Sequence, residues 1–219
     1  GEKIPLAKLE NAEKAKSEIY GLNGSKKQVA AVTAAEMLNI RSPLIVLARH
    51  PNETYDIAEI LYQKSRDDFE EDEDINLVKR LVESELGTDF PLAKYLERRI
   101  AVHSSALPGE IRLLIEDLMV QENKIQALVA TTTIAQGINF PVSAVIMGSY
   151  AYPSKTGSYD MPVRDFWNLA GRVGRTGQQD MGWVGIALSD DADLQAVGEY
   201  VLKASDELHS QLVKVIDQA

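Results

Sequence analysis

The sequence contains no cysteine and no long apolar run. The absence of cysteine excludes a disulfide scaffold, a cysteine nucleophile and a zinc site built on thiolates, and it suits a reducing cytoplasm, where we expect the protein to act. No stretch approaches the roughly 18 apolar residues of a membrane span, so we expect no membrane partner. Gly1 stands where an initiator methionine is usual, which predicts a domain cut from a longer protein.

The two motifs of an ATP-hydrolysing site do not occur together in the context that such a site needs. No Gly-x-x-x-x-Gly-Lys-Ser/Thr run exists, and the segment 23–26 lacks both the preceding strand and the spacing. The one Asp-Glu-x-His segment, at residues 206–209, lies in the expected C-terminal helical extension and follows neither an apolar strand run nor a phosphate-binding loop. Without a loop that cradles phosphates and a carboxylate that holds magnesium, an ATPase site is incomplete. We therefore expect this chain to bind no metal ion of its own and, in isolation, not to hydrolyse ATP.

Basic residues are outnumbered, because 23 Lys and Arg against 33 Asp and Glu give a net charge of −10. Phosphate binding draws its affinity from Lys and Arg, so this balance predicts weak, salt-sensitive binding of nucleic acid by the chain alone. Much of the acid lies in the run 67–74, which we interpret as a solvated loop or helix start rather than an acidic docking site. Residues 151–189, by contrast, carry four basic and three acidic side chains.

Short apolar runs alternate with amphipathic segments from Pro43 onward. The apolar runs predict strands at residues 44–48, 100–102, 127–130, 144–147 and 183–188. Uniformly apolar strands separated by helices are typical of a parallel sheet covered on both faces, so the predicted fold class is α/β. We expect an N-terminal helical segment at 1–42, the α/β domain at 43–190 and a C-terminal helical extension at 191–219. Functional loops then leave the carboxyl ends of the strands.

One polar loop follows the strand expected at 127–130. Thr131, Thr132 and Thr133 offer hydroxyls and, if a helix starts there, free backbone N–H groups, which together suit a phosphate. Gly137 permits a close backbone approach, and Asn139 offers both a donor and an acceptor. An ordinary strand-to-helix turn capped by threonine explains the same residues equally well.

A second polar segment combines glycines with two arginines. Gly171 and Gly174 each cost a helix about 1 kcal/mol relative to alanine, so their presence asks for close packing or a nearby ligand. Arg172 and Arg175 are three residues apart and would project from one helical face, with Asn168 on the same side. Two guanidinium groups on a common face suit a polyphosphate. For the arginine pair alone, a solvated basic face is the simpler interpretation.

Three segments resemble motifs of superfamily-two helicases. Residues 130–141 (ATTTIAQGINFP) resemble motif V, and residues 168–175 (NLAGRVGR) resemble motif VI, the Gln-x-x-Gly-Arg-x-Gly-Arg signature. Residues 102–108 (VHSSALP) are similar to the His-His-Ala-Gly-Leu-Pro segment of the superkiller-type subgroup. The order and spacing agree over residues 43–190. The chain is therefore similar to the second RecA-like domain of a DExD/H-box helicase, a parallel sheet flanked by helices.

The resemblance implies a nucleotide site shared between two domains. Arg175 would be the arginine finger that reaches the γ-phosphate, with Arg172 beside it. The residues near the nucleotide would be Gly137, Asn139, Asn168 and Gly171. ATP and Mg²⁺ would be bound mainly by an N-terminal RecA-like domain, which is the expected protein partner. Asn168 stands where the family usually has Gln, so its shorter amide would reach the nucleotide less well.

The same resemblance implies a grip on the backbone of single-stranded or partly duplex RNA or DNA. Thr131 and Thr132 would lie near one phosphate, and His103 and Ser104 at another backbone contact. Here the sequence departs from the family, because Ser-Ser-Ala stands where His-Ala-Gly is usual. A structural role fits His103 as well as a binding role does.

Two other functions stay open at this point. One is a helicase-like module that binds nucleic acid or protein without ATPase activity. The other, a small-molecule α/β enzyme, is disfavoured because no nucleophile–base pair is apparent and His103 has no obvious carboxylate partner. The stretch 150–161, rich in Tyr, Gly, Ser and Pro, we interpret as a plain surface loop in preference to a substrate loop.

Overall fold

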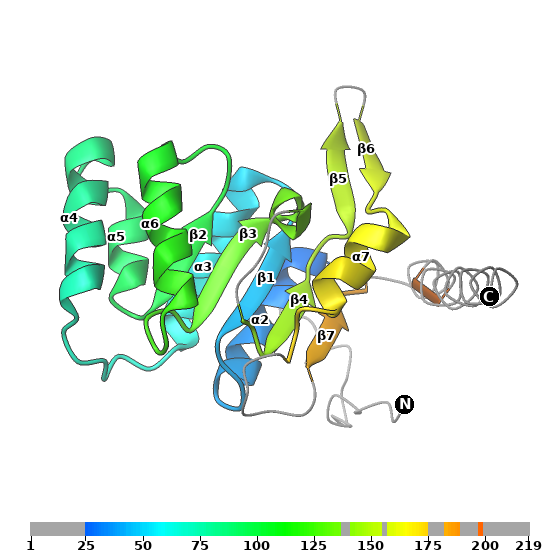
Figure 1. Ribbon diagram of the computed structural model, residues 1–219, viewed down its shortest axis with the longest axis horizontal. Coiled ribbons are helices and arrows are strands. Elements are labelled where there is room, and N and C mark those ends of the chain that lie inside the picture. Colours follow the sequence, from blue (N-terminus) through cyan, green and yellow to red (C-terminus); the bar gives the residue numbers. More distant parts are fainter. Residues whose placement is uncertain (1–24, 137–140, 155–156, 175–181, 189–196, 199–219) are drawn as a thin grey trace, which may run out of the picture.

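Five short strands pair side by side into one parallel sheet in the computed structural model, which describes residues 25–136, 141–154, 157–174, 182–188 and 197–198 (Figure 1). The sheet order is β2-β3-β1-β4-β7. The strands are β1 (Leu44–Ala48), β2 (Ile100–His103), β3 (Ala127–Thr131), β4 (Ala144–Met147) and β7 (Trp183–Ile186). The predicted strands and the α/β fold class are confirmed, with strand ends shifted by one or two residues.

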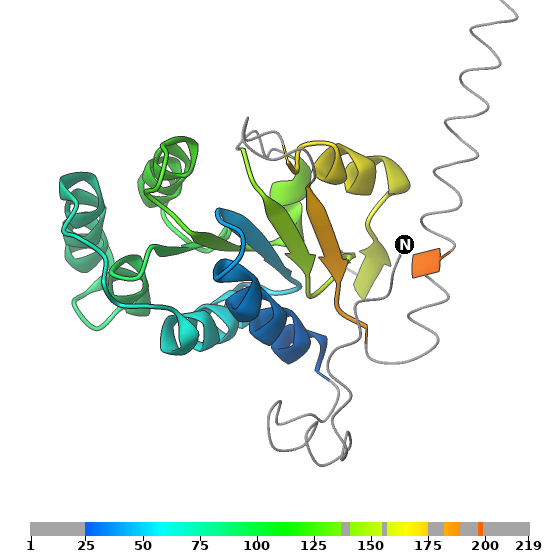
Figure 2. The same cartoon turned by 90° about the horizontal axis from the view of Figure 1, so that it is seen from below.

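Helices cover both faces of this sheet, as an all-parallel sheet requires. Figure 2 shows α2 (Lys26–Leu38) and α3 (Pro51–Lys64) on one face, and α6 (Gly109–Val120) and α7 (Val163–Ala170) on the other. The helices α4 (Glu73–Leu86) and α5 (Pro91–Leu96) pack together beyond β2, and α4 also packs against α6. None of the helices in the described ranges is long and apolar enough to cross a membrane.

The helix α2 belongs to the same hydrophobic core as the strands. Its buried face consists of Ala30, Ala31, Ala34 and Ala35, and it packs against β1, β4 and α3. Small side chains let the helix approach the sheet closely, and the fully buried β1 and β3 lie beneath it and α3. Residues 1–24 and nearly all of 191–219 lie outside the described residues, so the terminal extensions and the boundary at residue 43 stay predictions.

A two-stranded hairpin lies where the sequence analysis expected a plain surface loop, and that interpretation is wrong. The strands β5 (Ala151–Ser154) and β6 (Gly157–Asp160) pair antiparallel, and the hairpin projects beside α7 (Figure 1). Tyr152 is 2% exposed, and its hydroxyl donates to Oδ2 of Asp165 on α7 at 3.0 Å. The strand pattern was obscured because each strand is only four residues long and contains turn-forming residues.

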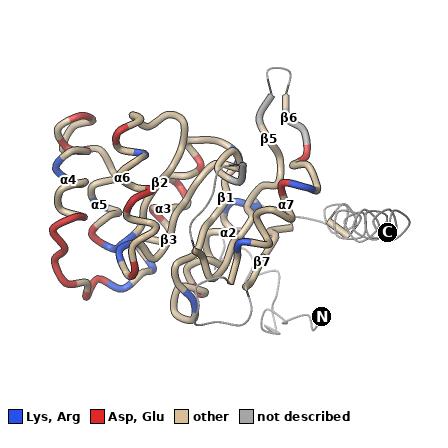
Figure 3. Tube along the Cα trace, in the orientation of Figure 1, with Lys and Arg blue, Asp and Glu red and all other residues tan. Residues whose placement is uncertain are grey.

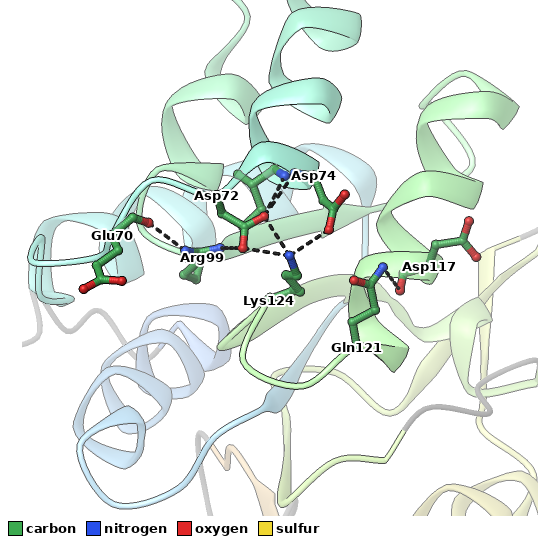
Figure 4. A network of polar contacts seen from close by, with 8 residues as sticks. Glu70, Asp72, Asp74, Arg99, Asp117, Gln121 and Lys124 are labelled. Atoms are coloured by element: carbon green, nitrogen blue, oxygen red, sulfur yellow. Dashed lines mark hydrogen bonds and ion pairs between the residues drawn. The ribbon is translucent and has the colours of Figure 1, made fainter.

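The acidic run 67–74 forms a loop and the start of α4, as predicted, but the carboxylate of its member Asp72 is mostly buried and bound by protein groups. The Asp72 carboxylate accepts hydrogen bonds from the backbone N–H groups of Asp74 and Ile75, which caps α4. It also accepts from Nζ of Lys124 at 2.8 and 2.9 Å and lies 3.3 Å from the buried guanidinium of Arg99 (Figure 4).

This cluster fixes the position of the acidic loop. Nη2 of Arg99 donates to the backbone carbonyl of Glu70 at 2.8 Å. Burial alone would raise the pKa of Asp72, but the hydrogen bonds from Lys124, the α4 backbone and Arg99 outweigh it and lower the pKa to about 2. Figure 3 shows acidic residues concentrated around this loop and α4, on the far side of the molecule from the hairpin. This concentration of acidic residues therefore lies away from the predicted site.

Candidate nucleotide and nucleic-acid site

The predicted site lies along the carboxyl edge of the sheet. Because β2, β3, β1 and β4 are parallel neighbours, His103, Thr131, Arg49 and Gly148 all lie at or just beyond the same edge. Between the ends of β1 and β4 a cleft of about 340 Å³ opens. Side chains of both signs line it: Lys26, Lys27, Arg49, Glu53 and Asp160. Its polar lining at a strand-end position suits a charged ligand.

The threonines of the motif V segment lie at this edge, on the turn that follows β3. The 3₁₀ helix η1 (Thr132–Gln136) begins directly after the strand. Thr131 is buried, and its Oγ1 lies 3.0 Å from Oγ1 of Thr133, whose side chain is exposed. Thr132 is fully buried and its hydroxyl donates to the carbonyl of Ala151 in the hairpin at 2.9 Å. A direct phosphate contact from the Thr132 hydroxyl would require this hydrogen bond to break. Of the three threonines, Thr133 is the one whose side chain is exposed to solvent.

The end of β2 carries His103, which has a carboxylate partner that the sequence analysis missed. Nε2 of His103 lies 2.7 Å from Oε1 of Glu116 on α6. The expectation that His103 has no carboxylate neighbour is therefore wrong. Ser104 is 1% exposed, and its hydroxyl has no hydrogen-bond partner among the described residues. The hydroxyl predicted to touch nucleic acid thus lies beneath the surface, while Ser105 beside it is exposed.

The motif VI segment is only partly helical, which corrects the expected arginine geometry. Helix α7 ends at Ala170, and Gly174 adopts a φ of 86°, a conformation that side chains disfavour. Arg172 therefore lies in the turn after the helix, with its N–H donating to the carbonyl of Leu169 at 3.1 Å. The expectation that Arg172 projects from a helical face is therefore wrong, because α7 ends two residues before it, and Arg175 lies outside the described residues.

The α7 residues predicted near the nucleotide are accessible. Asn168 is exposed on α7, and Gly171 is exposed at its end. Arg172 is half-buried, and its guanidinium makes no hydrogen bond or ion pair with any other described residue. Helix α7 packs against η1, so the motif VI turn and the motif V turn are neighbours. The predicted residues Gly137, Asn139 and Arg175 lie outside the described residues.

The described residues offer no metal centre. No group of three or more His, Asp or Glu side chains among them could hold a metal ion. The free polar groups of this edge are instead an amide, a half-buried guanidinium and hydroxyls. These groups donate hydrogen bonds and suit a phosphate-bearing ligand whose metal is held elsewhere.

Two residues that matter for the site escaped the sequence analysis. Glu116 is thirteen residues from His103, and no spacing rule joins a strand end to the next helix at that distance. Gly182 precedes β7, and a Cβ there would overlap the carbonyl group of Val173. Only glycine allows β7 to begin against the motif VI turn. The sequence shows a glycine at position 182, but it does not show that this glycine packs against Val173.

Residues 70–177 match the family described as the helicase conserved C-terminal domain. Hachiman protein HamB of Bacillus cereus is 34% identical over 154 residues, covering 68% of this chain and 13% of HamB. Activating signal cointegrator 1 complex subunit 3 of Homo sapiens is 36% identical over 120 residues, covering 53% of this chain and 5% of that protein. The ATP-dependent DNA helicase Hel308 of Pyrococcus horikoshii is 31% identical over 137 residues, covering 62% and 19%.

The fold, the motif positions and these similarities together define the class: the chain belongs to the C-terminal domains of superfamily-two helicases. Within that class the similarities to HamB, the cointegrator subunit and Hel308 support the superkiller-type subgroup. The chain spans only between 5% and 19% of the length of the three relatives named above.

Proposed function

We propose that this chain is the C-terminal motor lobe of an ATP-dependent nucleic-acid helicase. In this proposal Arg175 and Arg172 stabilise the transferring phosphoryl group of ATP, which is held with Mg²⁺ mainly on an N-terminal RecA-like lobe. Asn168 and Gly171 face the same nucleotide, together with Gly137 and Asn139. The carboxyl edge of the sheet grips the backbone of a single strand.

One observation carries the proposal: α7 packs against η1, so the turn with Arg172 and the turn after β3 are neighbours at one edge. A ligand bound to one turn can therefore change the position of the other. The incomplete nucleotide site also supports a shared arrangement, because a half-buried guanidinium with no described partner is available to an incoming phosphate. Closure on ATP would bring both lobes onto one strand, and hydrolysis would release them.

Contacts to the strand would carry little sequence preference, since a grip on phosphates and sugars does not read base edges. The net charge of −10 implies weak binding by this lobe alone, which strengthens when the second lobe joins it.

The test is the ATPase rate of the full-length protein, measured with and without single-stranded RNA or DNA. Arg175→Ala should lower kcat by about 10³–10⁵-fold, as removal of an arginine finger does in other phosphoryl-transfer systems. Arg164→Ala is the matched control, because Arg164 is exposed in the first turn of α7, away from the motif VI turn. A rate unchanged by Arg175→Ala would refute the finger assignment. A full-length protein that binds strands but has no ATPase activity would identify a binding module instead.

A further inference from the structure

The His103 imidazole faces one carboxylate, and this contact limits where its proton can lie. Within the described part of the chain its one polar contact is Nε2 to Oε1 of Glu116, at 2.7 Å. The His103 side chain is 12% exposed and that of Glu116 is 40% exposed. An ionised carboxylate only accepts hydrogen bonds, so Nε2 must be the donor. In the neutral ring the other nitrogen, Nδ1, then carries a lone pair and can only accept.

This pair differs from an arginine in its charge. A neutral imidazole beside a carboxylate has a net charge of minus one, and an imidazolium beside a carboxylate has none. In neither state does the pair supply the positive charge that phosphate binding draws on. Phosphate oxygens also accept hydrogen bonds and therefore cannot bond to a lone pair on Nδ1. The ligand group that suits Nδ1 is an uncharged donor.

We propose that Glu116 is a positioning residue that holds His103 with its proton on Nε2, so that Nδ1 accepts a hydrogen bond from an uncharged donor on the bound strand. This inference rests on the proposed function, because it requires that the carboxyl edge grips a nucleic acid. Such a donor has two sources on a strand, the ribose 2′-hydroxyl and the N–H groups of a base edge. The contact adds affinity that does not depend on salt.

Binding measurements with the full-length protein and a non-hydrolysable ATP analogue test this inference. The probes are short fluorescent RNA and DNA strands of the same sequence, titrated over a range of salt concentrations. His103→Phe and Glu116→Gln should each weaken binding by about two- to tenfold, the effect of one hydrogen bond, and leave the salt slope unchanged. The double variant should be no weaker than either single one, because Glu116 acts through His103.

The strands distinguish the source of the donor. A loss confined to RNA assigns the 2′-hydroxyl, and an equal loss on RNA and DNA assigns the base edge. Asp117→Asn is the matched control, since it removes a negative charge from an exposed neighbour on α6 and should leave affinity unchanged. Unchanged affinity in both His103→Phe and Glu116→Gln overturns the inference while leaving the proposed function intact. A salt slope lowered by about one in His103→Phe also overturns it, because His103 would then act as a phosphate cation.

Imidazole nitrogen shifts in NMR spectra of this chain give a readout that needs no strand. The wild type should show the Nε2-protonated tautomer for His103, and Glu116→Gln should show a mixture, because an amide can either donate or accept. A wild-type spectrum with the proton on Nδ1 overturns the inference. A full-length protein that binds neither RNA nor DNA refutes the proposed function itself.

Discussion

Replacing Asp72 by asparagine tests how strongly the polar cluster of Figure 4 anchors the acidic loop. Asparagine caps a helix about as well as aspartate, so the substitution removes the charge interactions with Lys124 and Arg99 and largely spares the cap of α4. Because Arg99 is 8% exposed, the change leaves a buried charge without its carboxylate. Breaking such a pair costs about 3–5 kcal/mol when both groups are fully buried.

The pKa of Asp72 gives an independent magnitude. Lowering it from 3.8 to about 2 corresponds to roughly 2.5 kcal/mol of folding free energy. The Asp72 side chain retains 17% exposure, so solvent screening reduces both figures. We expect Asp72→Asn to lower the free energy of unfolding by about 2 kcal/mol at pH 7, and Asp72→Ala to cost about 1 kcal/mol more through loss of the cap.

Urea unfolding followed by circular dichroism measures these values. A depressed carboxyl pKa stabilises the folded state above the unfolded pKa, and that stabilisation is lost as the pH falls through the folded pKa. The difference between wild type and Asp72→Asn should therefore be constant at neutral pH and shrink as the pH falls from 3.8 toward about 2. Asp74→Asn is the control, since Asp74 is 56% exposed and should cost at most about 0.5 kcal/mol. An equal, small effect for both variants would refute the reasoning.

Two further substitutions test the link between the site and its support. Thr132→Val removes the hydroxyl that donates to the Ala151 carbonyl while keeping the side-chain shape. It should lower the free energy of unfolding in urea by about 1–2 kcal/mol. The control Thr133→Val, at the exposed neighbour, should lower it by less than about 0.5 kcal/mol. Gly182→Ala should displace the motif VI turn, because the new Cβ would overlap the Val173 backbone. We expect thermal unfolding to show a free energy of unfolding lowered by more than about 2 kcal/mol. A variant as stable as the wild type would show that Gly182 and the motif VI turn are not in contact.

Apolar patterning was sufficient to predict the sheet, because β1, β3 and β4 are fully buried, β2 nearly so, and even the partly exposed edge strand β7 is rich in apolar residues. The run 44–48 became β1 and the run 127–130 became β3 with one added residue. The hairpin at 151–160 could not be predicted in this way, since its strands are only four residues long and contain turn-forming residues beside the buried Tyr152. Its stability comes from contacts with Thr132 and Asp165, which are distant in sequence.

The motif residues were likewise visible in the sequence, whereas their geometry was decided by the tertiary structure. The sequence by itself determined the α/β class, the strand ends at which polar residues gather, and the resemblance to helicases, because these depend on local patterning and residue identity. Only the tertiary structure decided that Arg172 leaves the helix before Gly174, that Thr132 is bound inside the domain, and that Glu116 meets His103. The Thr132 and Glu116 contacts join residues far apart in the sequence, and the end of α7 depends on the local backbone at Gly171, so none of these outcomes leaves a periodic signal in the sequence.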